Sequence, residues 1–163
     1  VHLFSRSARP KAIRYLAIGV SKLGNGWIYP ILLTIVFLGL GWRGWHVVLL
    51  AAANAALLHI LYPIIKRRFC RKRPFHVDQR LPSLLKTLDE HSFPSGHAMT
   101  LTGVLAPIVL AWPAMSLSAV VLVISMAWSR IATAHHYPSD VIAGIALGLG
   151  LAFPLSTYAL ALF

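Results

Sequence analysis

Uninterrupted apolar blocks dominate this sequence, and they leave it few folds to adopt. Blocks of this length with few charges are typical of helices that cross a membrane, where every backbone polar group has to be paired within the segment. The sequence therefore predicts an all-α integral membrane bundle of about five transmembrane helices, or six if one more segment crosses. The expected helices cover about Trp27–Gly41, His46–Ile65, His97–Trp112, Ala114–Ala132 and Ser139–Phe163.

The composition agrees with a membrane protein. Of the 163 residues, 58% are hydrophobic and 12% are charged, whereas soluble domains contain about 25% charged residues. These proportions argue against a soluble enzyme, a nucleic-acid-binding module and a disordered chain. Cys70 is the only cysteine, which excludes an internal disulfide and a metal site built from several thiolates. We therefore expect one membrane-embedded domain over residues 1–163.

The first 26 residues differ from the apolar blocks that follow. The segment Ile13–Leu23 carries Arg14 and Lys22 around a short apolar stretch, which is typical of an amphipathic helix that lies on a membrane surface. We expect residues 1–26 to form this interfacial segment and residues 27–163 to form the transmembrane core.

Basic residues are distributed unevenly over the two membrane faces that five helices imply. Every Lys and Arg except Arg43 lies on or next to the face that carries the N-terminus and the connections around 66–96 and 133–138. Because loops rich in Lys and Arg stay on the cytoplasmic side, this distribution predicts that the crowded face lies in the cytoplasm.

A basic run follows the second apolar block, with the sequence Lys66-Arg67-Arg68-Phe69-Cys70-Arg71-Lys72-Arg73-Pro74. Such runs commonly set topology or bind anionic lipid. If the helix continued, Lys66 and Arg73 would lie on one face, two turns or about 10 Å apart. The two cations could then bind one anion, with Arg as a bidentate fork and Lys as a point charge. Pro74 disfavours helical geometry at Arg73 and predicts that the helix ends there.

The third block opens with Pro94-Ser95-Gly96-His97. Ser95 is expected at the N-cap, and the unpaired backbone N–H groups of a helix start attract anions. Gly96 allows a ligand to approach the backbone closely. The alternative interpretation is an ordinary capped helix with an interfacial His97.

The fourth block ends at Ser129-Arg130, and His135-His136-Tyr137-Pro138-Ser139-Asp140 leads into the fifth. Pro138 predicts the first turn of a helix, and Asp140 falls in the same turn, where the helix dipole stabilises a carboxylate. A carboxylate beside His136 would fix its tautomer and leave the second nitrogen free as a nucleophile or base. The alternative is a stabilising helix-start Asp beside interfacial histidines.

The three clusters fall on one predicted membrane face and supply complementary parts of a phosphate site. The cations are Lys66, Arg73 and Arg130, the N–H donors come from the start of the third block, and the reactive groups are His97, His136 and Asp140. Metal binding is the weaker interpretation, because the arginines would repel a cation. We therefore expect an anion site that uses neither a metal nor another cofactor.

The clusters resemble, complete and in order, the three signature motifs of the type-2 phosphatidic-acid phosphatases: Lys-x6-Arg-Pro, Pro-Ser-Gly-His and Ser-Arg-x5-His-x3-Asp. That superfamily also includes acid phosphatases and vanadium haloperoxidases. The resemblance implies that His136 attacks phosphorus to form a phosphohistidine, that Asp140 orients the His136 imidazole, and that His97 protonates the leaving oxygen. It also implies that the phosphoryl oxygens are held by Lys66, Arg73, Arg130, Ser95 and the N–H group of Gly96.

Two features depart from many bacterial relatives, which the resemblance places in the cytoplasmic (inner) membrane. Those relatives have three spans before the first motif, whereas we count two. Many of them also act at the outer face of that membrane, whereas the charge distribution predicts a cytoplasmic site. We follow the charge distribution here, with the periplasmic face as the alternative.

A site at the ends of these helices would lie at the depth of lipid headgroups, so we expect a lipid phosphate as the substrate. Candidates are phosphatidic acid, phosphatidylglycerol phosphate, a prenyl or polyprenyl phosphate or diphosphate, and a phosphorylated lipid-linked sugar. Leu81, Leu84, Leu85 and Leu88 form an amphipathic stripe that could rest on the bilayer or pack on the protein. The competing functions are a non-catalytic anionic-lipid-binding or transport protein and a vanadate-dependent haloperoxidase.

Overall fold

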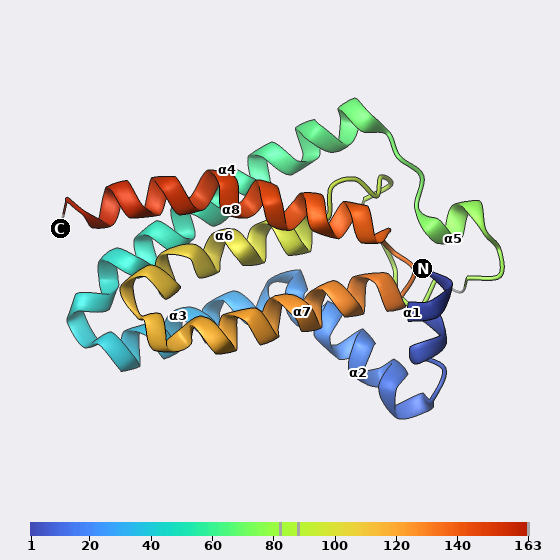
Figure 1. Cartoon of the computed structure of the whole chain (residues 1–163), viewed down its shortest axis with the longest axis horizontal. Helices are drawn as coiled ribbons and strands as arrows, with labels where there is room; N and C mark the ends of the chain where they lie inside the picture. The colour runs from blue at the N-terminus through green and yellow to red at the C-terminus, as the bar shows by residue number, and fades with distance from the viewer. Residues whose placement is uncertain (82, 88, 163) are drawn as a thin grey trace.

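Helices are the only regular secondary structure in the part of the chain that the structure describes, which comprises residues 1–81, 83–87 and 89–162 of a computed structural model. Five long helices make up the body of the bundle (Figure 1). The elements are α1 (His2–Ser7), α2 (Lys11–Lys22), the π-helical turn η1 (Leu23–Trp27), α3 (Ile28–Leu40), the 3-10 turn η2 (Gly41–Gly44), α4 (Trp45–Phe69), α5 (Pro74–Val77), α6 (Gly96–Ala111), the 3-10 turn η3 (Pro113–Met115), α7 (Ser116–Ala132) and α8 (Pro138–Leu160).

The five expected helices correspond to α3, α4, α6, α7 and α8, so the predicted all-α membrane fold is confirmed. Within the described residues, three stretches have the length and apolarity to cross a membrane: Lys11–Val77, which includes both α3 and α4, Pro113–Ala132 and Pro138–Leu160. The apolar helix α6 is shorter. The number of spans stays a prediction. The expected end of the last helix, Phe163, lies outside the described residues.

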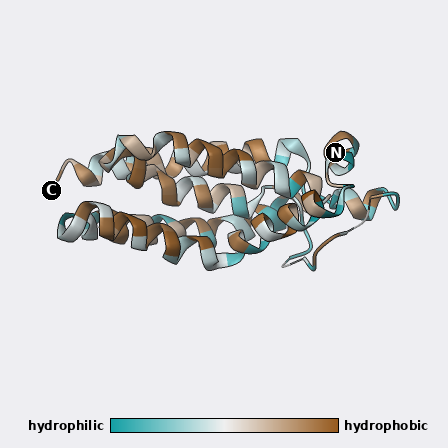
Figure 2. Ribbon diagram, turned by 90° about the horizontal axis from the view of Figure 1, so that it is seen from below, coloured by the Kyte–Doolittle hydropathy of each residue, from teal (hydrophilic) through white to brown (hydrophobic). Residues whose placement is uncertain are grey.

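Apolar residues cover the length of the bundle, and polar residues gather at the end that carries the N-terminus (Figure 2). Figure 1 shows that the α4–α6 connection and the α7–α8 loop lie at this same end, whereas the α3–α4 turn with Arg43 lies at the opposite end. The grouping of the basic segments at one end of the bundle therefore agrees with the sequence prediction.

Helix α6 is the centre of the bundle, and all of its residues from 98 to 108 are buried, mainly against α4 and α8. Gly148 lets α8 approach closely, because a Cβ atom there would overlap Thr102 and the backbone of Met99. Asn54 of α4 donates hydrogen bonds to Gly103 O (3.1 Å) and to Ser156 Oγ (3.0 Å). Small residues and interhelical hydrogen bonds of this kind hold membrane helices together. They fix the position of α6 between α4 and α8.

Helix α2 packs along α7, and its residues Ala17 and Ser21 are buried there. Ser129 Oγ donates a 2.7 Å hydrogen bond to Ala17 O. The predicted helix is therefore present, and it rests on the bundle through these two small residues, whereas its larger apolar residues Ile13 and Leu16 are exposed. Its place on a membrane surface, and the division of the chain at residue 26, stay predictions.

The α4–α6 connection contains no helix at the predicted leucine stripe, so this expectation was wrong for the described residues 81, 84 and 85. Leu88 lies outside the described residues. The carbonyl of Leu85 accepts a hydrogen bond from Ser83 Oγ (2.9 Å) and lies 3.1 Å from His135 Nε2. The Leu85 carbonyl thus forms hydrogen bonds with side chains, whereas in a helix it would accept one from a backbone N–H group.

Candidate active site

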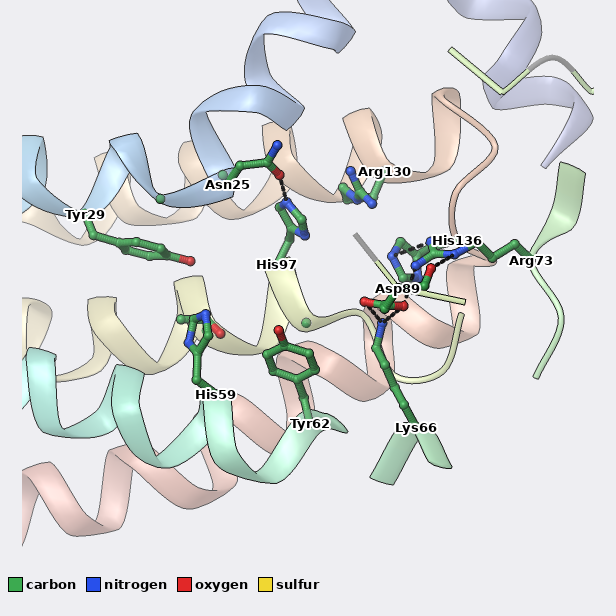
Figure 3. Close-up of a pocket in the computed structure, with 14 residues that line it drawn as sticks. Asn25, Tyr29, His59, Tyr62, Lys66, Arg73, Asp89, His97, Arg130 and His136 are labelled. Atoms are coloured by element: carbon green, nitrogen blue, oxygen red, sulfur yellow. Dashed lines mark hydrogen bonds and ion pairs between the residues drawn. The ribbon is translucent and has the colours of Figure 1, made fainter. Parts of the chain in front are cut away.

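A cavity of about 170 Å³ opens at the polar end of the bundle and brings together residues from all three sequence motifs (Figure 3). Six of the eight predicted site residues line it: Lys66, Arg73, Gly96, His97, Arg130 and His136. The other two, Ser95 and Asp140, are fully buried beside it and belong to its supporting structure.

Lys66 and Arg73 bind one anion, as predicted from the sequence. They do not lie on one face of a continuous helix, however, as their spacing of seven residues suggested. Helix α4 ends at Phe69, and Cys70 adopts a left-handed conformation (φ 48°). The chain then extends through Arg73 (ψ 153°) into α5, as expected for a residue before proline. The two side chains meet because the chain turns back, and the expected helix end at Arg73 was four residues too late.

The anion between the two cations is the carboxylate of Asp89. Lys66 Nζ lies 2.8 and 2.9 Å from its two oxygens, and Arg73 NH2 lies 2.7 Å from one of them. Burial raises the pKa of Asp89, but the hydrogen bonds and charges of Lys66 and Arg73 outweigh burial and hold it below its ordinary value. Asp89 is therefore ionised, and it lines the cavity although it belongs to none of the three motifs.

His136 is buried and has a defined tautomer. Its Nδ1 lies 2.7 Å from Ser92 O, and because a carbonyl only accepts hydrogen bonds, Nδ1 must carry the proton. Nε2 therefore presents a lone pair, 3.5 Å from Arg73 NH1. Burial, followed by the charges of Arg130 and Arg73, holds the pKa of His136 well below its ordinary value. The imidazole is thus neutral, as a nitrogen nucleophile requires.

Asp140 supports the loop that carries His136. Its Oδ2 accepts a hydrogen bond from the backbone N–H group of Tyr137 (2.8 Å), within a capping box at the start of α8. Its Oδ1 lies 2.7 Å from Arg71 NH1. The distance from Asp140 Oδ2 to His136 Nδ1 is 3.7 Å. The predicted pair is therefore in ion-pair range, but the hydrogen bond that orients the imidazole comes from Ser92.

Arg130 is held from two sides. Its NH1 donates to Ser21 Oγ of α2, and its NH2 lies 3.0 Å from His135 Nδ1. Burial, together with the charges of Arg130 and Arg73, lowers the pKa of His135 to about 3, so its ring is a neutral acceptor. His135, which no sequence motif singled out, thus fixes the direction of the Arg130 guanidinium.

His97 lies on the opposite wall from Arg73, at the start of α6 (Figure 3). Its Nε2 donates to Asn25 Oδ1 over 2.7 Å, since an amide oxygen only accepts. Asn25 belongs to η1, which approaches so closely that a Cβ atom on Gly24 would lie 2.7 Å from the His97 ring. Ser95 occupies the N-cap position as predicted, but its hydroxyl makes no cap and has no partner among the described residues.

The sequence profile of the PAP2 superfamily matches residues 43–162 of this chain. This chain belongs to the PAP2 superfamily. The matched region contains all three motifs, whereas Ser21 and Asn25, which contact Arg130 and His97, precede it.

The relatives of this PAP2 protein are phosphatases that are named for different lipids. Decaprenylphosphoryl-5-phosphoribose phosphatase of Mycobacterium tuberculosis is 40% identical over 137 residues, which cover 80% of this chain and 71% of the relative. Lipid A 1-phosphatase of Rhizobium etli is 28% identical over 87% of this chain and 69% of the relative. The crystal structure of a PAP2-type phosphatidylglycerolphosphate phosphatase from Bacillus subtilis matches with a TM-score of 0.69 and 26% identity, over 96% of this chain and 82% of that one.

Several residues of this PAP2 site were not predicted from the sequence. Asp89 had a signal, because it is one of only four acidic residues. Ser92 acts through its backbone carbonyl, which its residue type does not reveal. Asn25 belongs to the segment predicted to be interfacial, and nothing in its local sequence points to His97.

Proposed function

We propose that this membrane-integral lipid phosphate phosphatase hydrolyses a phosphomonoester or diphosphate of a lipid through a phosphohistidine on His136. The observation that carries the proposal is the arrangement around that side chain. A neutral, buried imidazole with its Nδ1 proton on Ser92 O presents Nε2 to a cavity that Lys66, Arg73 and Arg130 line.

In the first step, Nε2 of His136 attacks phosphorus, an N–P bond forms, and the bond from phosphorus to the leaving oxygen breaks. His97 donates a proton to that oxygen, and a bound phosphate dianion favours the protonated imidazole that this step needs. Lys66, Arg73 and Arg130 stabilise the charge on the transferring phosphoryl oxygens. Fixed side-chain cations supply this stabilisation without a metal ion.

In the second step, a water molecule attacks the phosphorus of the intermediate and gives its proton to His97. The N–P bond breaks, inorganic phosphate leaves, and His136 returns to its neutral form. Atoms and charges balance over the two steps, because His97 regains the proton it donated to the alcohol.

Phosphate binding requires Asp89 to move away from the cations. Its carboxylate occupies the hydrogen-bonding positions of Lys66 and Arg73 that phosphoryl oxygens would take. Asp89 is half-exposed and lies in the irregular α4–α6 connection, so its displacement needs no helix to move.

The positive-inside rule supports a cytoplasmic site in an inner membrane, because Arg43 alone among the Lys and Arg residues lies away from the polar end. The exposed thiol of Cys70, at the same end, provides the test. In sealed right-side-out vesicles, a membrane-impermeant maleimide should label Cys70 only after permeabilisation. Labelling of intact vesicles would place the site on the outer face.

Lipid phosphate hydrolysis is tested with purified protein in detergent and in EDTA, on phosphatidic acid, phosphatidylglycerol phosphate and farnesyl phosphate. We expect phosphate release by the wild type and a loss of about 1000-fold or more in His136→Ala. The control is His76→Ala, an exposed residue of α5, which should retain wild-type activity. An equally active His136→Ala protein, or a strict requirement for Mg²⁺, would refute the mechanism.

A non-catalytic anionic-lipid-binding or transport protein would need the cations but not the nucleophile. Such a protein would bind these lipids and release no phosphate from any of them. The same assay therefore separates the two functions.

A further inference from the structure

The cavity continues past His97, away from the phosphate-binding cations. Figure 3 shows Tyr29 and His59 on this side, with Tyr62 between them and Lys66. We call this part the polar compartment. Its lining residues are Asn25, Tyr29, His59, Tyr62 and Thr100.

Polar side chains that gather at this position need a physical explanation, because α3, α4 and α6 consist mainly of apolar residues. Polar and ionisable groups inside a membrane bundle are costly and commonly mark a substrate site. His59 is an exposed residue that also lines the cavity, two helical turns or about 10 Å from Lys66 toward the middle of α4. Thr100 lies one turn after His97 on α6. The polar lining thus extends from the catalytic end into the bundle.

Thr100 has a buried hydroxyl whose hydrogen bonding is incomplete. The residue is 1% exposed, and its hydroxyl has the Tyr29 hydroxyl as a neighbour but makes no hydrogen bond of good geometry among the described residues. A buried hydroxyl without a well-placed partner loses free energy relative to one in water. A ligand hydroxyl in the polar compartment would supply that partner.

His59 and Tyr62 also have groups available to a ligand. His59 Nδ1 donates to Ala55 O over 3.0 Å, so its Nε2 is left as an acceptor. The Tyr62 ring lies edge-on to His59, with 5.4 Å between centroids, and Lys66 Nζ lies 5.6 Å from its centre. Tyr62 therefore connects the phosphate-binding end with the polar compartment.

The hydrogen bond of His97 indicates on which side of the cavity the leaving alcohol would lie. Nε2 donates to Asn25 Oδ1, and a leaving oxygen would accept a proton from the same nitrogen. Asn25 Oδ1 thus marks the approximate position of that oxygen, at the border of the polar compartment. An alcohol bonded to this oxygen would extend toward Thr100 and His59.

We propose that the polar compartment binds a leaving group that carries free hydroxyls, such as the sugar or glycerol part of a lipid headgroup. This inference rests on the proposed phosphatase function and narrows its substrate class. A phosphate attached directly to a hydrocarbon chain would place apolar carbon against the hydroxyls and imidazole of the compartment. Sites built to hydrogen-bond a substrate reject analogues that lack the partner groups, because buried polar groups are then left unpaired.

The test compares kcat/KM for phosphatidylglycerol phosphate, whose leaving glycerol carries a hydroxyl, with kcat/KM for farnesyl phosphate, in the same detergent. For the wild type, we expect a preference of about 10-fold or more for the glycerol ester. Thr100→Val and His59→Leu should each lower kcat/KM for that ester about 5- to 10-fold, and change farnesyl phosphate hydrolysis less than 2-fold. The matched control is Thr34→Val, an exposed threonine of α3 that bonds Pro30 O, which should change neither value.

Each result bears on one of the two proposals. Equal wild-type efficiency on both lipids, or an equal loss on both lipids in Thr100→Val, would overturn the polar compartment as a headgroup site and leave the phosphatase function standing. A wild type that hydrolyses no lipid phosphate would overturn the phosphatase function and this inference with it. The wild-type comparison holds even if a variant fails to fold.

Discussion

Lys66 and Asp89 form a two-point ion pair, with Nζ 2.8 and 2.9 Å from the two carboxylate oxygens. Arg73 binds the same carboxylate through NH2 and the same residue's backbone carbonyl through Nε (3.2 Å). A carboxylate held in this way by two cations imitates a bound phosphate. Asp89 and the substrate therefore compete for the same positive charges.

Replacing Asp89 with Asn should strengthen anion binding, because an amide competes less well for the cations than a carboxylate does. We expect the inhibition constant of orthovanadate in Asp89→Asn to fall about 10-fold, since charge-assisted hydrogen bonds are roughly twice as strong as neutral ones. Glu90→Gln, a change at the exposed neighbouring acid, should leave this constant unchanged. Weaker vanadate inhibition in Asp89→Asn would show instead that Asp89 holds the cations in place.

Asp140 contributes mainly as an acceptor for the Tyr137 N–H group. Asp140→Asn keeps an acceptor oxygen, so it should retain about a tenth of the wild-type kcat, whereas Asp140→Ala should fall at least another 10-fold. The alanine variant should also be less stable by about 1 kcal/mol, the usual effect of losing a helix cap. Steady-state kinetics and thermal unfolding in detergent measure the two effects. Equal kcat values for both variants would show instead that Asp140 acts through its negative charge on His136, 3.7 Å away.

Acid should destabilise the fold through His135 and His136. Burial and neighbouring cations place both pKa values below the ordinary 6.5, and that of His135 at about 3. The unfolded chain takes up protons below about pH 6.5 while the folded chain does not, so stability falls as the pH drops from 6.5 toward 3. The expected slope is about 1.4 kcal/mol per pH unit for each imidazole.

The pH dependence can be followed by thermal unfolding in detergent. His135→Asn should lower the slope between pH 6 and pH 4 by about 1.4 kcal/mol per pH unit, the contribution of one imidazole. The exposed His76→Asn serves as the control and should leave the slope unchanged. A stability that is independent of pH over this range would contradict the neutral, buried state of both imidazoles.

Close packing of α6 and α8 predicts opposite responses at two glycines of α8. A Cβ atom at Gly148 would overlap Thr102 and Met99, whereas a Cβ atom at Gly150 would meet nothing within 4 Å. Gly148→Ala should therefore lose about 1–3 kcal/mol of stability, and Gly150→Ala should be neutral or slightly stabilising. Thermal unfolding of both variants checks the difference, and equal melting temperatures would argue against this helix contact.

The sequence predicted the helices and most of the cavity for a physical reason. Apolar blocks have few alternatives to helices in a membrane, and the motif residues Lys66, His97 and His136 carry their chemistry in their side chains. The helix end at Phe69 was missed because Cys70 adopts a left-handed conformation that its residue type does not announce. Periodicity alone did not find such local turns.

The supporting contacts of the site depend on tertiary structure. Ser92 orients His136 through a carbonyl that every residue possesses. Asn25 reaches His97 across 72 positions of the sequence, from a turn between two helices. Asp89 reaches Lys66 and Arg73 from the irregular α4–α6 connection, whose path follows no periodic pattern. These contacts follow from how distant segments meet, so no local pattern predicts them.

The most direct test of the mechanism is to trap the phosphoryl group on the nucleophile. His97→Ala should react with a good leaving group such as 4-nitrophenyl phosphate and then hydrolyse its intermediate slowly, because water lacks its general base. Mass spectrometry after rapid alkaline quenching should find a phosphoryl group on His136, and the His97→Ala/His136→Ala double variant should carry none. A phosphoryl group on another residue, or one that persists in the double variant, would contradict the account.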